Sequence, residues 1–232
     1  ARVGLTVDSS TTGTSVEQWR FGGYGTYKMG ATSFEFEFDH LFGDSENETT
    51  NVSTDYDSWA YYLAVNHKMN DLTMGAMAWV LTGDLDQANS TTQANTAGDD
   101  ESYASSAGDD FNPLLIATGD DFGLLNDETT SGYSALVGAF GQQAIGAYAS
   151  MPLSDKLTGT VVVGSAWSDE QTNGWDDHYG YEIDIVLDYK VLDNMTYTVN
   201  FGYFDAGDLF DKTPGTGTTA TLDALEDEIV LL

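Results

Sequence analysis

Two runs of alternating acidic residues are the part of this chain most able to act on ions. Their members are Glu35, Glu37, Asp39, Glu182, Asp184 and Asp188. Alternate residues of a β-strand point to the same side of a sheet, so each run predicts one acidic face. Such a face lining a lumen attracts cations and repels anions, as rings of Asp or Glu do in cation-selective pores. The alternative interpretation is the solvated face of a soluble sheet.

Arg20 falls on a polar face with Gly22, Tyr24 and Thr26. It is a candidate basic partner for the luminal acids, and the blander interpretation, a structural ion pair, is favoured for it. The three histidines, His40, His67 and His178, are isolated, so the spacing predicts no transition-metal site. No G-x-S-x-G or phosphate-binding glycine motif occurs in a suitable context, and we expect no enzyme activity.

Composition limits the partners of the chain. Its 232 residues include 38 acidic and 7 basic side chains, a net charge of −31 that argues against nucleic acid as a partner. There is no cysteine, which excludes a disulfide scaffold and thiolate-bound metals. Acidic pairs in the long polar segment are weak candidates for Ca²⁺, namely Asp99, Asp100, Asp109 and Asp110. They lack EF-hand spacing, so a solvated acidic loop is favoured and no cofactor is expected.

The dominant hydrophobic period is two, which predicts strands with one aromatic-rich face and one polar or small-residue face. The predicted strands are 2–8, 16–28, 32–43, 58–68, 72–83, 134–151, 157–168, 178–190 and 195–206, with a tenth beginning near Leu225. Many have 11 to 13 residues, close to the roughly 9–11 of strands that cross an outer membrane. The run 134–151 is predicted to bend or break at Gly141.

The predicted connections alternate in length. Short ones lie near residues 29–31, 67–71, 152–156 and 190–194, and long ones near 43–57, 84–132, 168–177 and from 205 onward. Four lysines lie at or beside the short turns, namely Lys28, Lys68, Lys156 and Lys190. This alternation predicts an all-β, antiparallel up-and-down transmembrane β-barrel, with tight turns at one rim and acidic loops at the other. We expect a single domain over 1–232, with a loop and partial strand over 207–232.

Aromatic side chains near the predicted strand ends fit girdles at two membrane interfaces. The candidates are Trp19, Tyr27, Trp59, Tyr61, Trp79, Trp167, Trp175, Tyr179, Tyr189 and Tyr203. The alternative is the core of a β-sandwich, which would use Val, Ile and Leu at least as heavily. Within the longest loop, an apolar stretch is a candidate constriction that folds into the lumen, through Phe111, Pro113, Leu114 and Phe122.

Three hairpins resemble those of Gram-negative outer-membrane porins, in particular the acidic porins of anaerobic proteobacteria and the alginate-export-like porins. They read 147–158 (AYASMPLSDKLT), 188–197 (DYKVLDNMTY) running into 202–208 (GYFDAGD), and 65–72 (VNHKMNDL). The loop piece 111–115 (FNPLL) is also similar to the loops of the second group. Two features depart from the family: the last residues, 229–232 (IVLL), lack a closing aromatic, and general diffusion porins have more strands. A small barrel or the C-terminal part of a larger one would explain this, and we favour the part.

The resemblance and the residue pattern together predict an outer-membrane porin, a passive and cation-preferring diffusion channel for small solutes. Its expected partners are the lipid bilayer, outer-membrane lipid, small ions and solutes, and a second copy in a homo-oligomer. The alternative is an acidic extracellular or cell-surface β-protein, structural or carbohydrate-binding, without channel activity. A barrel with a plugged lumen would share the fold of the channel and differ only in conductance.

Overall fold

The computed structural model describes residues 2–6, 13–49, 52–83, 98–100, 141–170, 176–211 and 228–231. In these residues the chain forms strands and one 3₁₀ helix, η1, over Asp208–Asp211. The strands are β1 Arg2–Thr6, β2 Thr14–Met29, β3 Thr32–Asn47, β4 Val52–Met69, β5 Leu72–Leu81, β6 Gly98–Asp100, β7 Gln142–Ser154, β8 Leu157–Trp167, β9 His178–Leu192, β10 Met195–Ala206 and β11 Glu228–Leu231. No helix in these ranges is both long and apolar enough to cross a membrane.

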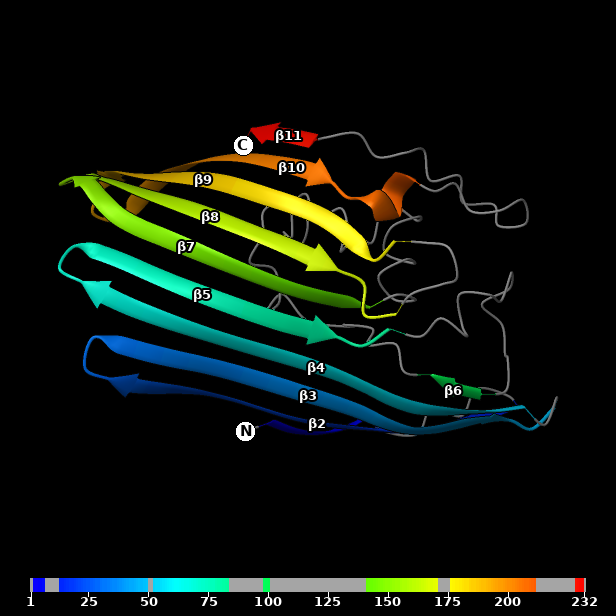
Figure 1. Ribbon diagram of the computed structural model, residues 1–232. Coiled ribbons are helices and arrows are strands. Elements are labelled where there is room, and N and C mark those ends of the chain that lie inside the picture. The colour runs from blue at the N-terminus through cyan, green and yellow to red at the C-terminus, as the bar shows by residue number, and fades with distance from the viewer. Residues whose placement is uncertain are drawn as a thin grey trace.

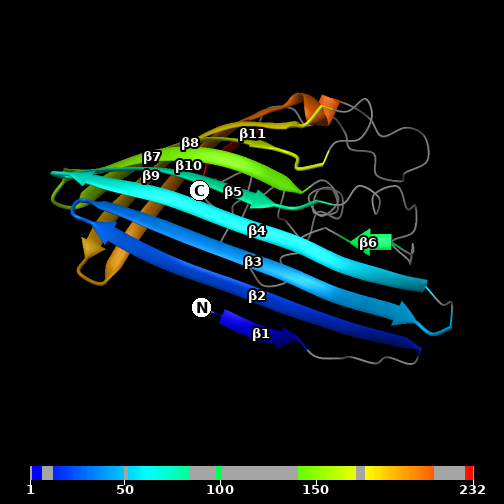
Figure 2. The same ribbon diagram turned by 60° about the horizontal axis from the view of Figure 1, so that its bottom comes forward.

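All of these strands belong to one sheet, and ten of them follow the chain order from β1 to β11 (Figure 1). Every neighbouring pair on this path is antiparallel. The eleventh strand, β6, lies off the path and pairs in parallel with Thr54–Tyr56 of β4. The sheet is strongly curved, so that β9 and β10 turn away behind β2 and β3 (Figure 2). The all-β, up-and-down arrangement predicted from the alternating pattern is therefore confirmed.

Tight turns join β2 to β3, β4 to β5, β7 to β8 and β9 to β10 at one end of the sheet (Figure 1). Gly30 and Asn70 occupy the left-handed backbone region in two of them, with φ of 63° and 55°. Glycine enters this region freely and asparagine more readily than most residues, which explains their use at these turns. The long connections leave from the opposite end, as the sequence predicts.

The predicted long loop over 43–57 is wrong, because most of it is strand. β3 continues to Asn47 and β4 begins at Val52, which forms a hairpin that extends beyond β5. Polar residues alternate with other polar residues here, so no hydrophobic period marks the strand.

β7 begins directly after Gly141, whose φ of 65° agrees with the predicted break. Residues 134–140 lie outside the described ranges, and β6 was not predicted.

Buried apolar side chains concentrate on one face, toward the strand ends that lead to the long connections. Among the described residues they include Ala60, Trp79, Leu81, Ala144, Ala166 and Phe204. The opposite face carries large apolar side chains that are exposed, such as Phe21, Leu63 and Ile145. The sheet therefore buries its smaller and more polar face and leaves its apolar face open.

Candidate functional site

Cross-strand partners point to the same side of a sheet, so the pairing register assigns each residue to a face. One row of partners contains Thr26, Glu35, Ala64, Met77, Gly146, Gly164, Glu182 and Phe204. We call the side of this row the inner face, because it lies within the curve of the sheet (Figure 2). The row places Glu35 of β3 and Glu182 of β9 in one line, with four strands between them.

All six predicted acidic residues, and Arg20, lie on this inner face. Glu182 and Asp184 are buried, with 4% and 1% of their surface exposed, and Asp39 is also buried. Asp188, nearer the short turns, accepts a hydrogen bond of 2.6 Å from the Thr198 hydroxyl. The strands between β3 and β9 contribute many small residues to this face, such as Ala64, Gly146 and Gly164. That these residues line a conducting lumen stays a prediction.

Arg20 and Asp39 form an ion pair on the inner face, between β2 and β3. The Arg20 guanidinium donates to Asp39 Oδ2 through Nη2 and, at 3.1 Å, through Nε. Gly22 is the direct cross-strand partner of Asp39, and a Cβ there would collide with the Asp39 carboxylate. The missing side chain at Gly22 therefore gives the carboxylate room to reach Arg20.

Polar contacts also cross the small-residue strands. The buried Trp79 donates its indole N–H to Gln142 Oε1 at 2.9 Å, and Tyr148 donates to Asn66 Oδ1 at 2.7 Å. The assignment of Trp79 to an interfacial girdle is wrong, since Trp79 is on the inner face. Its strand alternates Ala76 and Ala78 with bulkier residues, so the larger side chains mark the inner face here, opposite to the other strands. Sequence reasoning therefore missed Trp79 and Gln142 as parts of this face.

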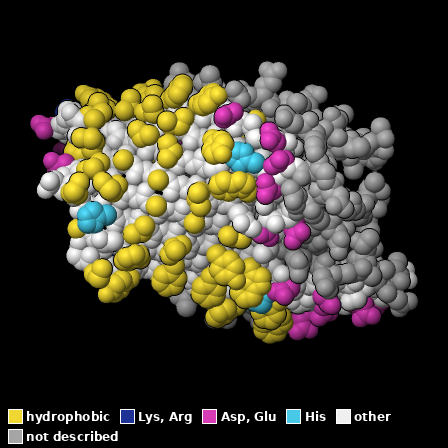
Figure 3. Space-filling model, in the orientation of Figure 1, with side chains coloured by type: hydrophobic (Ala, Val, Ile, Leu, Met, Phe, Trp, Pro, Cys, Tyr) yellow, Lys and Arg dark blue, Asp and Glu magenta, His cyan; other side chains and the backbone are white. Residues whose placement is uncertain are grey.

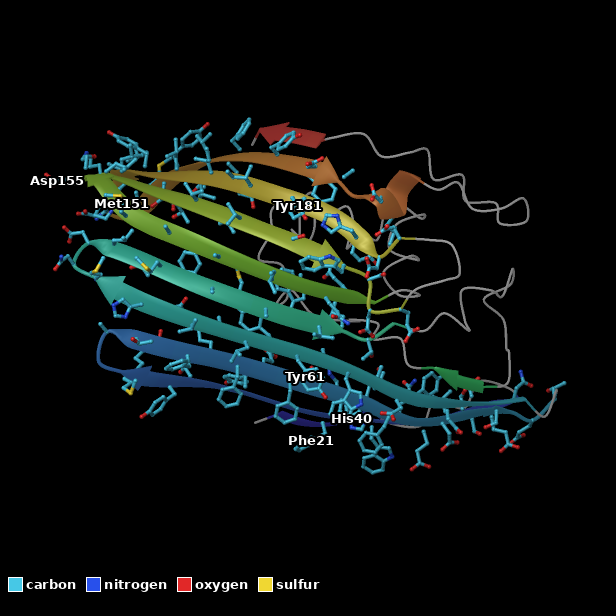
Figure 4. All side chains as sticks on the ribbon, in the orientation of Figure 1. Phe21, His40, Tyr61, Met151, Asp155 and Tyr181 are labelled. Carbon is cyan, nitrogen blue, oxygen red and sulfur yellow. The ribbon has the colours of Figure 1, made fainter. Side chains whose placement is uncertain are left out.

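The second row, one residue along each strand, points to the opposite side and is apolar throughout. It contains Tyr27, Phe34, Val65, Ala76, Ala147, Val163, Ile183 and Tyr203. We call this side the outer face, and Figure 3 shows apolar side chains distributed across it. Phe21, Tyr61 and Tyr181 point off it into open space (Figure 4). The sheet therefore has an apolar, exposed exterior that extends over eight strands.

Aromatic residues on the outer face gather toward both ends of the strands. Tyr27 and Tyr189 lie near the short turns, and both are well exposed. Toward the long connections lie Trp19, Trp59, Tyr61, Trp167 and Tyr203, which are exposed or half-buried. These positions agree with the predicted aromatic bands, whose role at membrane interfaces stays a prediction. Trp175 lies outside the described residues.

Tyr179 does not belong to these bands, contrary to prediction. A bulge lets Ala166 pair with Gly180 and Trp167 with His178, which leaves Tyr179 out of the ladder. Tyr179 is fully buried, and its hydroxyl donates at 2.8 Å to the carbonyl oxygen of Gly141. The extra residue of a bulge breaks the two-residue alternation, so the sequence pattern assigned this tyrosine to the wrong face.

A cluster of polar and aromatic groups marks the outer face where β3 and β4 leave the apolar band. The His40 ring stacks on Trp59 with 3.6 Å between centroids and 7° between planes. Asp57 Oδ1 lies 2.7 Å from His40 Nε2 and accepts the indole N–H of Trp59 at 3.1 Å. Beyond this cluster, Glu17, Asp44 and Asp55 form one cross-strand row of carboxylates. Along these strands the outer face therefore changes from apolar to acidic beyond the pair Trp19 and Phe42.

Several predicted residues lie where their geometry is not described. The constriction candidates Phe111, Pro113, Leu114 and Phe122, and the calcium candidates Asp109 and Asp110, lie outside the described residues. Asp99 and Asp100 form part of β6, of which only the backbone is described. In the described part of the chain, no group of three or more His, Cys, Asp or Glu side chains could hold a metal ion.

The four predicted lysines, Lys28, Lys68, Lys156 and Lys190, all lie at the short-turn end and are exposed. Lys190 pairs with Asp193 in its turn at 3.1 Å. The register puts Lys28 and Lys68 on the inner face, beside Ser33 and Thr73. Lys28 and Lys68 therefore add positive charge to the inner face at this rim.

Comparison with solved structures finds chains with a related arrangement. The outer membrane channel DcaP of Acinetobacter baumannii superimposes with a TM-score of 0.44 at 15% sequence identity. The alignment covers 87% of this chain and 51% of that one, so the chain spans about half the length of the channel. No family model and no curated protein sequence matches the chain.

Proposed function

We propose that this chain forms the wall of an outer-membrane channel through which small cations diffuse in preference to anions. The observation that carries the proposal is the pair of adjacent rows described above. One row exposes only apolar side chains over eight strands, and its neighbour presents Glu35 and Glu182 on the other side. Lipid outside and water inside is the environment that suits both rows, because outer-membrane barrels alternate apolar and polar residues in this way.

The exposed apolar side chains of the outer face favour a lipid environment over bulk water. Monomeric soluble proteins rarely expose contiguous apolar patches larger than a few hundred Å². Here Leu63 of β4 and Ile145 of β7 are 58% and 56% exposed. An acidic surface protein without a membrane would have to cover this entire face with a partner. The antiparallel ladder also pairs backbone groups strand by strand, as a bilayer requires.

The acidic inner face supports cation preference. Fixed carboxylates on two facing walls raise the local concentration of cations, and this effect weakens as ionic strength rises. Arg20 compensates Asp39, and the inner face carries further carboxylates on β3 and β9, at Glu35, Glu37, Glu182, Asp184 and Asp188. Burial increases toward the long connections, where Ala60, Trp79 and Asp184 are almost inaccessible. This burial supports a constriction at that level.

The experiment is a planar-bilayer recording of the purified chain under a KCl gradient. We expect discrete conductance steps and a reversal potential on the K⁺ side. The matched comparison is Glu35→Gln/Glu37→Gln against Asp44→Asn/Asp55→Asn, since each variant removes two carboxylates, from the inner and the outer face respectively. Confirmed insertion without steps would contradict an open channel. Failure to insert would contradict the membrane assignment and favour the surface protein.

A further inference from the structure

Tyrosine side chains lie on the inner face beside the carboxylate of Glu35. On β4, Tyr62 and Asn66 point to this face on either side of Ala64, the direct cross-strand partner of Glu35. Ala64 carries only a methyl group and is buried. The Glu35 carboxylate interacts electrostatically with Tyr62 and also with Tyr148 of β7. One carboxylate therefore has two tyrosines from different strands beside it.

The position of the Tyr148 ring is fixed by a hydrogen bond that crosses a whole strand. The Tyr148 hydroxyl donates to Asn66 Oδ1 at 2.7 Å, although β5 lies between β7 and β4. Gly75 is the β5 residue that pairs with both Tyr148 and Asn66, and a Cβ there would collide with each of them. The ring therefore lies along the sheet over Gly75, and its other face is turned toward the inside of the curve.

The combination of acid and tyrosine recurs in the next row of the inner face. Glu37 pairs directly with Tyr24 of β2 on one side and with Tyr62 of β4 on the other. Tyr24 is 65% exposed, and Tyr62 and Tyr148 are half-buried. Three partly accessible tyrosines thus lie among the carboxylates of β3.

A carboxylate beside tyrosine rings suits an organic ammonium ion. The π electrons make the face of an aromatic ring negative, so a cation within about 6 Å of the ring centre is attracted to it. Alkyl groups on the nitrogen also pack on the ring, which favours an organic cation over a hydrated potassium ion. A neutral solute gains nothing from the charge of the carboxylate, and an anion is repelled by it.

We propose that Glu35, Tyr62 and Tyr148 form a binding site for small organic ammonium ions on the path through the channel. The carboxylate supplies the charge, and the two rings supply faces on which the alkyl groups around the nitrogen pack. The proposal rests on the proposed function, because it takes the inner face as the one in contact with water. It deepens that function, since the channel then selects among cations by binding as well as against anions by charge.

Choline is the probe for this site in planar-bilayer recordings. Added to a KCl solution, choline should reduce the K⁺ current in a saturable way, because the bound ion occupies the path. Its neutral isostere, in which carbon replaces the nitrogen, has the same shape without the charge and should leave the current unchanged. Tyr62→Leu/Tyr148→Leu should raise the choline concentration for half block about tenfold, the loss expected for two partly exposed cation–π contacts.

Matched variants separate the ring faces from other effects. Tyr62→Phe/Tyr148→Phe keeps both rings and should be blocked like the wild type, and so should Tyr61→Leu, which removes a tyrosine from the outer face. Glu35→Gln leaves every ring in place and should weaken the block. Conductance steps without choline show that each variant is folded and inserted.

Several results would overturn the site. They are an equal block of wild type and the double leucine variant, an equal block by choline and its neutral isostere, a loss in the double phenylalanine variant as large as in the leucine one, and an unchanged block in Glu35→Gln. A protein that conducts K⁺ and is not blocked by choline contradicts only this site. A protein that inserts without conducting contradicts the proposed function, and choline binding to it in detergent, followed by NMR, still tests the site.

Discussion

Asp39 pairs with Arg20 across the space that a side chain on its cross-strand neighbour, Gly22, would occupy. The Arg20 Nε donates to Asp39 Oδ2 at 3.1 Å, and a Cβ on Gly22 would occupy the place of the Asp39 carboxylate. Three residues on two strands therefore form one unit. The pair places a positive charge among the acids of the inner face, and it depends on a glycine that no charge pattern identifies.

Gly22→Ala should destabilise the fold by about 1–3 kcal/mol, because the new methyl group overpacks against the Asp39 carboxylate. Unfolding in guanidinium chloride, followed by tryptophan fluorescence in detergent, measures the change. The double variant Gly22→Ala/Asp39→Ala removes the collision. If the clash is the cause, the free-energy changes of the two single variants will not add, since contacting residues couple. Additive losses would contradict this explanation.

Arg20→Gln should increase cation preference, because it removes the guanidinium charge that compensates Asp39. A shift of the reversal potential toward the K⁺ limit under a KCl gradient measures the effect. Arg20→Lys keeps the charge and serves as the control, with a reversal potential close to that of the wild type. If Arg20→Gln and Arg20→Lys give the same reversal potential, this ion pair does not contribute to cation preference.

Glu35→Gln/Glu37→Gln should reduce cation preference, whereas Asp44→Asn/Asp55→Asn should leave it nearly unchanged. The first pair lies on the inner face and the second on the outer face, so equal numbers of charges are removed on opposite sides of the sheet. The reversal potential again provides the measurement. A larger effect from the outer pair would reverse the assignment of the two faces.

Leu63→Lys should cost about 2–4 kcal/mol when the protein is folded in lipid vesicles, the penalty for a lysine near the bilayer midplane. Tyr24→Lys is the matched change on the inner face, at a side chain that is 65% exposed against 58% for Leu63. Its cost should stay within about 0.5 kcal/mol, as for other surface substitutions. Equal costs at the two positions would contradict a lipid-facing outer surface.

Trp79→Phe should destabilise the fold by about 1–3 kcal/mol, because it removes a donor and leaves the buried Gln142 Oε1 without its indole partner. Trp59→Phe is the control: its indole also donates a hydrogen bond, but to the exposed Asp57, which water can satisfy. Thermal unfolding in detergent, followed by the loss of the β-sheet circular dichroism signal, ranks the two. If Trp59→Phe destabilises the fold as much as Trp79→Phe does, burial of the Trp79 hydrogen bond does not explain the loss of stability.

The alternation of residue types was sufficient to predict the antiparallel up-and-down order and the acidic face. It failed where a different physical signal decides the structure. Tyr179 is the extra residue of a bulge. The bulge turns its side chain to the other face, although the residues around it in the sequence still alternate. Trp79 lies on a strand whose outer residues are alanines, so side-chain size misleads. The 43–57 hairpin is polar on both faces and carries no hydrophobic period.

Beside that hairpin, β2 contributes Glu17 to a cross-strand row with Asp44 and Asp55. Like charges directly opposite each other on neighbouring strands oppose their pairing. Dissolved ions shield this repulsion, so the three strands hold together better in brine than in dilute water. The salt concentration of the surroundings thus sets how firmly this hairpin and β2 stay paired, and amide hydrogen exchange over 43–47 and 53–57 should slow as sodium chloride is added.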